Sequence, residues 1–218
     1  MSKALKIDFV SDIVCPWCAI GLAGLNTALA RIGPATPVEF TIHPFELNPN
    51  LPAAGQDQLE HITEKYNISA DQARANREQI RARAASVGFT MNRDDASRVY
   101  NTFDGHRLLA WAQQKNAQMA LKQVLLKAYF TDGKNIADRE VLADLAAQAG
   151  LDRAEASEVL ASDRFAQEVR AEEALWIQRG ISSVPAVVVN DRYLISGGQP
   201  PKVFEEQLRA ILAGDERE

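Results

Sequence analysis

Alternating hydrophobic and polar positions predict β-strands at both ends of the chain. From Leu5 to Phe9 every second residue is hydrophobic, which is the two-residue period of a strand with one buried face. The same alternation returns at residues 38–42. Late in the chain, two apolar runs at residues 185–189 and 193–195 flank a short polar segment, and this arrangement predicts a β-hairpin.

Between these strands the hydrophobic spacing is helical. At residues 121–129 the hydrophobic positions recur three, four, seven and eight residues apart, which gives a helix one apolar face. Ser69 and Gln72 have the spacing of a capping box, and Asp138 is placed as a helix N-cap. We predict helices at residues 16–29, 69–88, 121–129, 138–150, 163–179 and 200–211.

The order of the elements is strand, helix, strand, several helices, two strands and a helix. This order fits an α/β fold in which a helical block is inserted into a small mixed sheet with its covering helices. We assign residues 1–50 and 163–218 to the α/β domain and residues 51–162 to the inserted helical domain.

Composition and charge narrow the possible functions. The chain has 218 residues and 46% hydrophobic residues, enough to bury a core without disulfide bonds. A net charge of −5 and the lack of a basic stripe argue against nucleic acid as a partner. No apolar run is long enough to span a bilayer, and residues 1–10 do not resemble a cleavable leader. We therefore expect a cytoplasmic protein without a membrane partner.

The chain has only two cysteines, Cys15 and Cys18. A bond between residues this close would close a very small loop and stabilise the fold little, so a redox or metal role is the better interpretation. A structural zinc site needs four ligands, and His43, His61 and His106 lack ligand spacing. We favour redox chemistry over a metal site and over a pair of ordinary buried cysteines.

The position of Cys15 at the predicted start of a helix bears on its reactivity. Free N–H groups and the helix dipole stabilise a negative charge there, so the thiol pKa should lie below its free value of ~8.5. Cys18 lies one turn further along and can attack a mixed disulfide formed on Cys15. Pro16 and Trp17 add no charge, which leaves the helix terminus as the main expected cause of the shift. Trp17 either contacts a partner or packs on the inserted domain.

These residues support a resemblance to a known family. The run Cys15-Pro16-Trp17-Cys18 after a strand, with Val184-Pro185 before a later strand, resembles the thioredoxin superfamily. The inserted helical block is similar to that of the DsbA family, and most of all to its FrnE-type cytoplasmic branch. The stretches that carry the resemblance are residues 11–21, 43–49, 101–109, 180–185 and 196–201.

The resemblance implies a thioredoxin-like fold with an inserted helical domain. It also implies that Cys15 is the nucleophile, that Cys18 is the resolving cysteine, and that Pro185 is a cis-proline facing them. Ala19 and Ser183 depart from the family pattern, and both changes alter the surface of the groove. The substrate groove expected from the resemblance comprises Pro16, Trp17, Val184, His43 and His106. Each of the two histidines has a structural role inside the fold as its alternative.

The leading hypothesis is a thiol–disulfide oxidoreductase or disulfide isomerase that acts on protein or small-molecule disulfides. It needs no cofactor beyond its dithiol and no metal, with glutathione as a candidate co-substrate. The alternative is a glutathione-dependent transferase or isomerase, of the kappa-class or 2-hydroxychromene-2-carboxylate isomerase type. Such enzymes typically carry Ser at the position of Cys15, so the second cysteine favours dithiol chemistry. The third hypothesis, a non-catalytic binding or chaperone module, would not need both thiols.

Overall fold

The computed structural model describes residues 4–52 and 54–214. Within these residues the main sheet consists of β1 (Leu5–Ser11), β2 (Val38–Pro44), β5 (Ala186–Val189) and β6 (Tyr193–Ser196). The strand order is β2-β1-β5-β6. β1 pairs in parallel with β2 and antiparallel with β5, and β6 runs antiparallel to β5. The strands and the hairpin predicted from hydrophobic alternation are confirmed.

The turn between β5 and β6 explains why the hairpin forms. Asn190 and Asp191 both have positive φ angles, 53° and 54°. Asn and Asp enter this left-handed region more readily than most residues, and two such residues in succession give the twist that joins antiparallel strands. The Asn190 side chain also accepts a 3.0 Å hydrogen bond from the backbone N–H of Lys6, which fixes the turn to the central strand.

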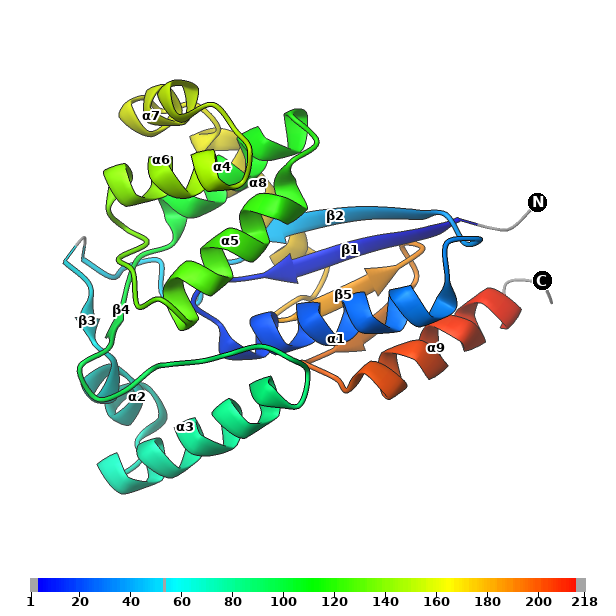
Figure 1. Ribbon diagram of the computed structural model, residues 1–218, viewed down its shortest axis with the longest axis horizontal. Helices are drawn as coiled ribbons and strands as arrows, with labels where there is room; N and C mark the ends of the chain where they lie inside the picture. Colours follow the sequence, from blue (N-terminus) through cyan, green and yellow to red (C-terminus); the bar gives the residue numbers. More distant parts are fainter. Residues whose placement is uncertain (1–3, 53, 215–218) are drawn as a thin grey trace.

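The side chains of β1 divide the core between the two faces of the sheet. Leu5, Ile7 and Phe9 are fully buried in the main core. Two helices, α1 (Pro16–Ile32) and α9 (Pro201–Gly214), lie side by side along the sheet (Figure 1) and contribute to the same core. The buried residues of α1, among them Leu22 and Leu25, therefore pack against the hydrophobic residues that alternate along β1.

The opposite face of the sheet is covered by α8 (Ala166–Gln178). Val10 alternates with Phe9 and joins Trp176 of α8 in a second apolar cluster. This helix starts three residues later than residue 163, where the sequence placed it. Phe165 adopts a left-handed backbone with φ 63° immediately before α8, and this conformation separates the helix from the preceding segment.

The remaining elements gather at the end of β1 where α1 begins (Figure 1). Here α2 and α3 lie on one side and α4 to α7 on the other. The capping box of Ser69 and Gln72 and the Asp138 N-cap are both present, as predicted. All these elements lie within residues 51–162; the domain boundaries themselves stay a prediction. The elements are β3 (Gln56–Asp57), α2 (Gln58–Tyr66), α3 (Ala70–Ala85), β4 (Arg98–Val99), α4 (Phe103–Gln114), α5 (Gln118–Phe130), α6 (Arg139–Gln148) and α7 (Arg153–Ala161).

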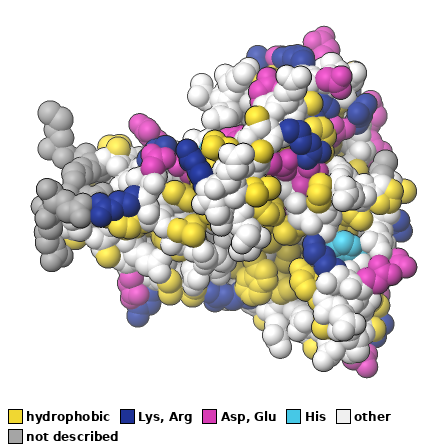
Figure 2. Space-filling model, turned by 180° about the vertical axis from the view of Figure 1, so that it is seen from behind, with side chains coloured by type: hydrophobic (Ala, Val, Ile, Leu, Met, Phe, Trp, Pro, Cys, Tyr) yellow, Lys and Arg dark blue, Asp and Glu magenta, His cyan; other side chains and the backbone are white. Residues whose placement is uncertain are grey.

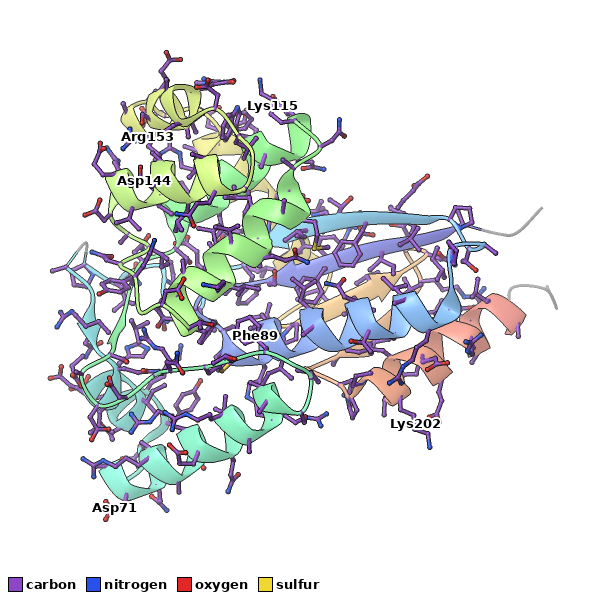
Figure 3. The ribbon with its side chains drawn as sticks, viewed as in Figure 1. Asp71, Phe89, Lys115, Asp144, Arg153 and Lys202 are labelled. Atoms are coloured by element: carbon purple, nitrogen blue, oxygen red, sulfur yellow. The ribbon has the colours of Figure 1, made fainter. Side chains whose placement is uncertain are left out.

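Side-chain contacts hold α7 against α6. Arg153 at the start of α7 donates a 2.6 Å hydrogen bond to Asp144 of α6, and the two side chains lie next to each other in Figure 3. Because both are about half exposed, this ion pair orients the helices more than it stabilises them. None of the helices in the described part of the chain combines the length and apolar character that crossing a membrane requires.

Candidate active site

The cysteine pair lies where β1 passes into α1. Cys15 is the N-cap residue, with an extended backbone (φ −85°, ψ 115°), and Pro16 occupies the first turn, where its missing N–H leaves no hydrogen bond unmade. Both cysteines are free thiols. Cys15 is 4% exposed and Cys18 is fully buried one turn into the helix. Cys15 thus keeps a small exposed surface, whereas Cys18 is enclosed.

The segment that leads into β5 lies against Cys15. The Val184–Pro185 peptide bond is cis. The Cys15 thiol donates to the carbonyl oxygen of Val184, with a sulfur–oxygen distance of 3.7 Å. Pro185 also packs against α1, because a Cβ added to Gly21 would lie 3.1 Å from the Pro185 Cγ atom. The structure therefore brings Cys15, Val184 and Pro185 together, although they are far apart in the sequence.

The loop after β6 completes this side of the site. A Cβ added to Gly198 would lie 2.8 Å from the carbonyl oxygen of Trp17, closer than real Cβ contacts come. Only glycine fits at this position without moving the first turn of α1. Trp17 itself is 42% exposed, so its ring is available to a partner rather than packed in the core.

The two thiols differ in acidity. The pKa of Cys15 is lowered, first because the Cys18 thiol donates a hydrogen bond to the Cys15 thiolate. Burial of Cys15 opposes this effect, and the backbone N–H groups of Cys18 and Trp17 add to it. The pKa of Cys15 is thus shifted downward, as the sequence predicted. The largest cause of this shift is the neighbouring Cys18 thiol rather than the helix terminus alone.

Cys18 behaves in the opposite way. Burial raises its pKa well above the ordinary thiol value, and the neighbouring Cys15 raises it further. The positive charge of Lys122 on α5 acts against this rise. Lys122 is itself fully buried, burial lowers its pKa, and its ammonium group has no hydrogen-bond partner among the described residues. A buried cation thus stands close enough to Cys18 to influence the charge of its thiol.

A second buried charge, Asp12, lies between β1 and the cysteine motif. Its carboxylate accepts hydrogen bonds from the backbone N–H of Ile13 (2.6 Å) and of Leu47 (2.8 Å). Burial alone would raise the pKa of Asp12, but hydrogen bonds from His106, Leu47 and Thr102 outweigh it and hold the pKa below its usual value. Asp12 therefore fastens the segment after β2 to the cysteine loop as an anion.

A large cavity opens beside Cys15. Its volume is about 630 Å³, within the usual range for small-molecule sites of roughly 300–1,000 Å³. Pro16, Trp17 and Val184 line it on the side of the cysteine motif, and α2 and α3 line the other side. Figure 2 shows hydrophobic side chains gathered in a hollow beside the part of the molecule formed by α2 and α3, with a histidine and a Lys or Arg side chain at its edge.

Comparison with known proteins identifies the fold family. The family model described as a DSBA-like thioredoxin domain matches residues 6–209, nearly the whole chain. The protein belongs to this family. Membership supports thiol–disulfide oxidoreductase chemistry at the level of the family, and the mixed sheet with its inserted helices is the thioredoxin-like fold that the sequence predicted.

Solved structures give the same result. A probable DsbA oxidoreductase from Streptomyces coelicolor is 36% identical, with a TM-score of 0.89 over 96% of this chain and 90% of the other. The cytosolic disulfide reductase DsbM from Pseudomonas aeruginosa, solved with GSH, is 18% identical, with a TM-score of 0.64 over 95% and 99% of the two chains. A 2-hydroxychromene-2-carboxylate isomerase is 14% identical, with a TM-score of 0.68 over 97% and 98%. The last two similarities concern the fold alone.

The structure places the three histidines differently from the expectation. His43 lies on the sheet face covered by α8, where its ring nitrogens are 2.7 Å from Asp8 and 2.5 Å from Glu172. His106 is buried, with Nε2 3.3 Å from Asp12. Neither lines the cavity beside Cys15, since strand alternation and the packing of α4 direct both into the interior. His61, which was not part of the expected groove, does line the cavity.

Two lysines close to the thiols were missing from the sequence-based site. Lys122 falls on the buried face of α5 that contains Leu121 and Leu125. The hydrophobic pattern of this helix could therefore have predicted that Lys122 is a charged residue among core positions. Lys65 near the end of α2 lines the cavity, and the charge of Cys15 acts on it. No local pattern distinguishes Lys65 from an ordinary surface lysine. Within residues 4–52 and 54–214, no group of three or more His, Cys, Asp or Glu side chains is arranged to hold a metal ion.

Proposed function

We propose that this protein is a thiol–disulfide oxidoreductase in which Cys15 is the nucleophile and Cys18 the resolving cysteine. The observation that carries the proposal is the contrast between the two thiols. The pKa of Cys15 is lowered where the sulfur borders a cavity, whereas the pKa of Cys18 is raised where the sulfur is buried. Attack requires a thiolate, so the site favours Cys15 for the first step and keeps Cys18 protonated until the second.

The reaction proceeds in two exchanges. The Cys15 thiolate attacks one sulfur of a substrate disulfide, forms a mixed disulfide and releases the other sulfur as a thiolate, which takes up a proton from solvent. Cys18 then loses its proton and attacks the Cys15 sulfur, which releases the second substrate thiolate. Two electrons pass to the substrate, and the Cys15–Cys18 pair ends as a disulfide. The reverse sequence oxidises a dithiol, and attack of Cys15 on a wrongly paired protein disulfide gives isomerisation.

The surroundings of the pair suit an extended disulfide-containing substrate. The Val184 carbonyl faces Cys15, and the backbone of this residue offers a strand-like partner for a bound peptide. Pro16 and Trp17 form the opposite edge, where the half-exposed Trp17 ring supplies contact area. Cys15, Cys18 and Pro185 are the proposed catalytic centre. Pro16, Trp17 and Val184 are the proposed groove, from which we now omit His43 and His106.

A cytoplasmic location, membership of the FrnE-type branch and glutathione as co-substrate belong to the same proposal. Their support is the resemblance of the motif stretches and the similarity of the fold to a cytosolic disulfide reductase solved with GSH. The similarity to 2-hydroxychromene-2-carboxylate isomerase supports the alternative of a glutathione-dependent isomerase. The presence of both cysteines favours the dithiol reaction over this alternative.

Reduction of insulin driven by dithiothreitol tests the proposal. Cys15→Ser should abolish the activity, because no nucleophile remains. Cys18→Ser should accumulate a mixed disulfide on Cys15, detected by mass spectrometry. Ser182→Ala is the control, since Ser182 lines the same cavity and carries no thiol that could exchange with a disulfide. If Cys15→Ser kept most of the activity, or if only glutathione-dependent isomerisation were found, the assignment would be wrong.

A further inference from the structure

Access to Cys15 limits the kind of substrate that reaches it. Only 4% of the surface of Cys15 is exposed, and the residue forms part of the wall of the 630 Å³ cavity. An attacking thiolate must meet its disulfide in line with the sulfur–sulfur bond, so the disulfide has to enter the space beside Cys15. A small molecule can place its whole body in a cavity of this volume.

The cavity wall is apolar over most of its area. α2 contributes Ile62, α3 contributes Ile80, and the link between the two helices contributes Ile68. The segment before β4 contributes Met91. Apolar surface of this kind stabilises a ligand in proportion to the hydrophobic area that it removes from water. The wall therefore selects a ligand with an apolar body, whereas a strongly hydrated body would gain little from entering.

Apart from the Cys15 thiolate, the charged side chains of the wall are all positive. Lys65, Arg77, Arg81 and Arg93 line the cavity, and no Asp or Glu is found among the described residues that do so. This is notable in a chain with a net charge of −5. A cavity lined by one sign of charge attracts the opposite charge. The wall is therefore complementary to an anionic ligand.

Three of these cations already have partners. Arg77 donates to Asp95 over 2.6 Å, and Arg81 donates to Glu78 over 3.1 Å. Arg93 is buried and donates to the hydroxyl and the carbonyl oxygen of Tyr129, so its guanidinium is committed to the fold. These arginines contribute a positive field, and each guanidinium group is held by the fold through some of its N–H groups, although the Nε atom of each has no partner among the described residues.

Lys65 differs from the arginines. Its ammonium group donates to the carbonyl of Leu47 (3.1 Å) and to the side chain of Asn48 (2.7 Å), and no carboxylate of a described residue pairs with it. An ammonium group has three N–H donors, so one remains for a ligand. The charges of Asp12 and Cys15 both act on Lys65, which places this cation close to the reacting sulfur.

We propose that the cavity binds a small disulfide with an apolar body and a carboxylate group, with the carboxylate on Lys65 and the body against Ile62 and Ile80. This inference rests on the proposed oxidoreductase function and adds the substrate class to it. Cys15 attacks the nearer sulfur of the bound disulfide and the other half leaves as a thiolate. Attack by Cys18 releases the second half and oxidises the cysteine pair, so electrons and protons balance as in the general reaction.

The test compares two aromatic disulfides of similar shape: dithiobis(nitrobenzoate), which carries carboxylates, and dithiodipyridine, which is uncharged. The rate constant of a single turnover with reduced protein is measured for each disulfide. The ratio of the rate constant for dithiobis(nitrobenzoate) to that for dithiodipyridine is then compared between variants. The ratio cancels any general change in the reactivity of Cys15. Lys65→Met should lower the ratio roughly fivefold, the upper end for a partly exposed ion pair.

Matched variants separate charge from structure. Lys202→Met is the first control, because Lys202 projects from α9 (Figure 3), does not line the cavity, and has a side chain that is 82% exposed. Ile62→Glu places a carboxylate in the wall and should lower the ratio, whereas Ile62→Gln should leave it near the wild-type value. α2 buries no residue completely, so these changes should not prevent folding.

The outcomes separate this inference from the proposed function. If insulin is reduced but Lys65→Met and Ile62→Glu leave the ratio at the Lys202→Met value, the substrate class is wrong and the oxidoreductase assignment stands. If neither insulin nor either small disulfide is reduced, both fail. A lower ratio in Lys65→Met and in Ile62→Glu, with both controls unchanged, supports the anionic, apolar substrate.

Discussion

Replacing the buried lysine, Lys122→Met, should make the protein more stable and its redox cycle slower. The Lys122 side chain is fully buried in α5, and its ammonium group has no hydrogen-bond partner among the described residues. Leaving a buried polar group without a partner costs about 1–3 kcal/mol. Methionine has a similar length and no polar donor, so it should fill the same space without this cost.

The expected gain in stability of Lys122→Met follows from the same energy. A gain of about 1–3 kcal/mol in a chain of 218 residues corresponds to a rise in Tm of roughly 2–12 °C. Asp12 attracts the ammonium group, so the lower half of this range is expected. Asp12 keeps its own hydrogen bonds to Ile13 and Leu47 in the variant, so no new unpaired atom arises.

The stability advantage of Lys122→Met should depend on pH in a defined direction. Burial lowers the pKa of Lys122 below 10.5, so the unfolded chain binds the proton more tightly than the folded one. The resulting loss of stability is complete below the folded-state pKa and disappears as the pH rises from that value towards 10.5. The stability advantage of Lys122→Met should therefore shrink as the pH rises through this window.

Although Lys122→Met should raise stability, it should slow the redox cycle. The charge of Lys122 holds down the raised pKa of Cys18, so its removal should raise that pKa further. Each unit of rise lowers the thiolate fraction about tenfold. The nucleophilicity of the thiolate rises by about threefold, because the Brønsted coefficient is about 0.4–0.5. The attack of Cys18 on the mixed disulfide should then slow by about threefold per unit.

Two measurements check this prediction. Urea unfolding of the reduced protein at several pH values gives the stability, and stopped-flow release of the second thiolate from an aromatic disulfide gives the resolving step. Lys127→Met is the control, since Lys127 lies on the same helix with 64% of its side chain exposed. A variant less stable than this control by more than about 1 kcal/mol, with an unchanged resolving step, would refute the reasoning.

Two further predictions concern the site itself. Thiolate absorbance against pH should show Cys15 titrating below the free-thiol value of ~8.5 and Cys18 well above Cys15; a Cys15 value at or above ~8.5 would contradict the account of its acidity. Gly198→Ala should slow disulfide exchange by displacing the first turn of α1, because its Cβ would lie 2.8 Å from the Trp17 carbonyl oxygen. Gly214→Ala, with open space around its Cβ, should leave the exchange rate unchanged.

The parts of the fold that local chemistry decides were predictable from the sequence. Strand alternation in β1, Pro16 in the first helical turn and the Asn190-Asp191 turn each act within a few residues. The cysteine pair was predictable for the same reason, since its chemistry depends on a spacing of three residues. The approach of Val184 to Cys15 came only from the resemblance, because no local pattern joins residues so far apart.

The parts that depend on packing between distant segments were not predictable. His106 belongs to a stretch that resembles the family, yet α4 turns it towards Asp12 rather than the cavity. The start of α8 was placed three residues early, because the left-handed conformation of Phe165 leaves no mark in the hydrophobic pattern. The position of Lys65 depends on how α2 lies beside the cysteine motif, which periodicity does not reveal.

The thioredoxin-like part of the fold and the inserted helices contribute different groups to the site. The thioredoxin-like part supplies both sulfurs and the segment around Pro185, whereas Lys65 and Lys122 belong to helices inserted between its strands. Lys65 stands at the cavity wall and Lys122 is buried near Cys18, so one cation faces the proposed substrate site and the other acts on the thiol of the proposed resolving cysteine. We therefore expect that a change in the inserted helices can alter substrate preference and the rate of the proposed resolving step separately, while Cys15 and Cys18 stay unchanged.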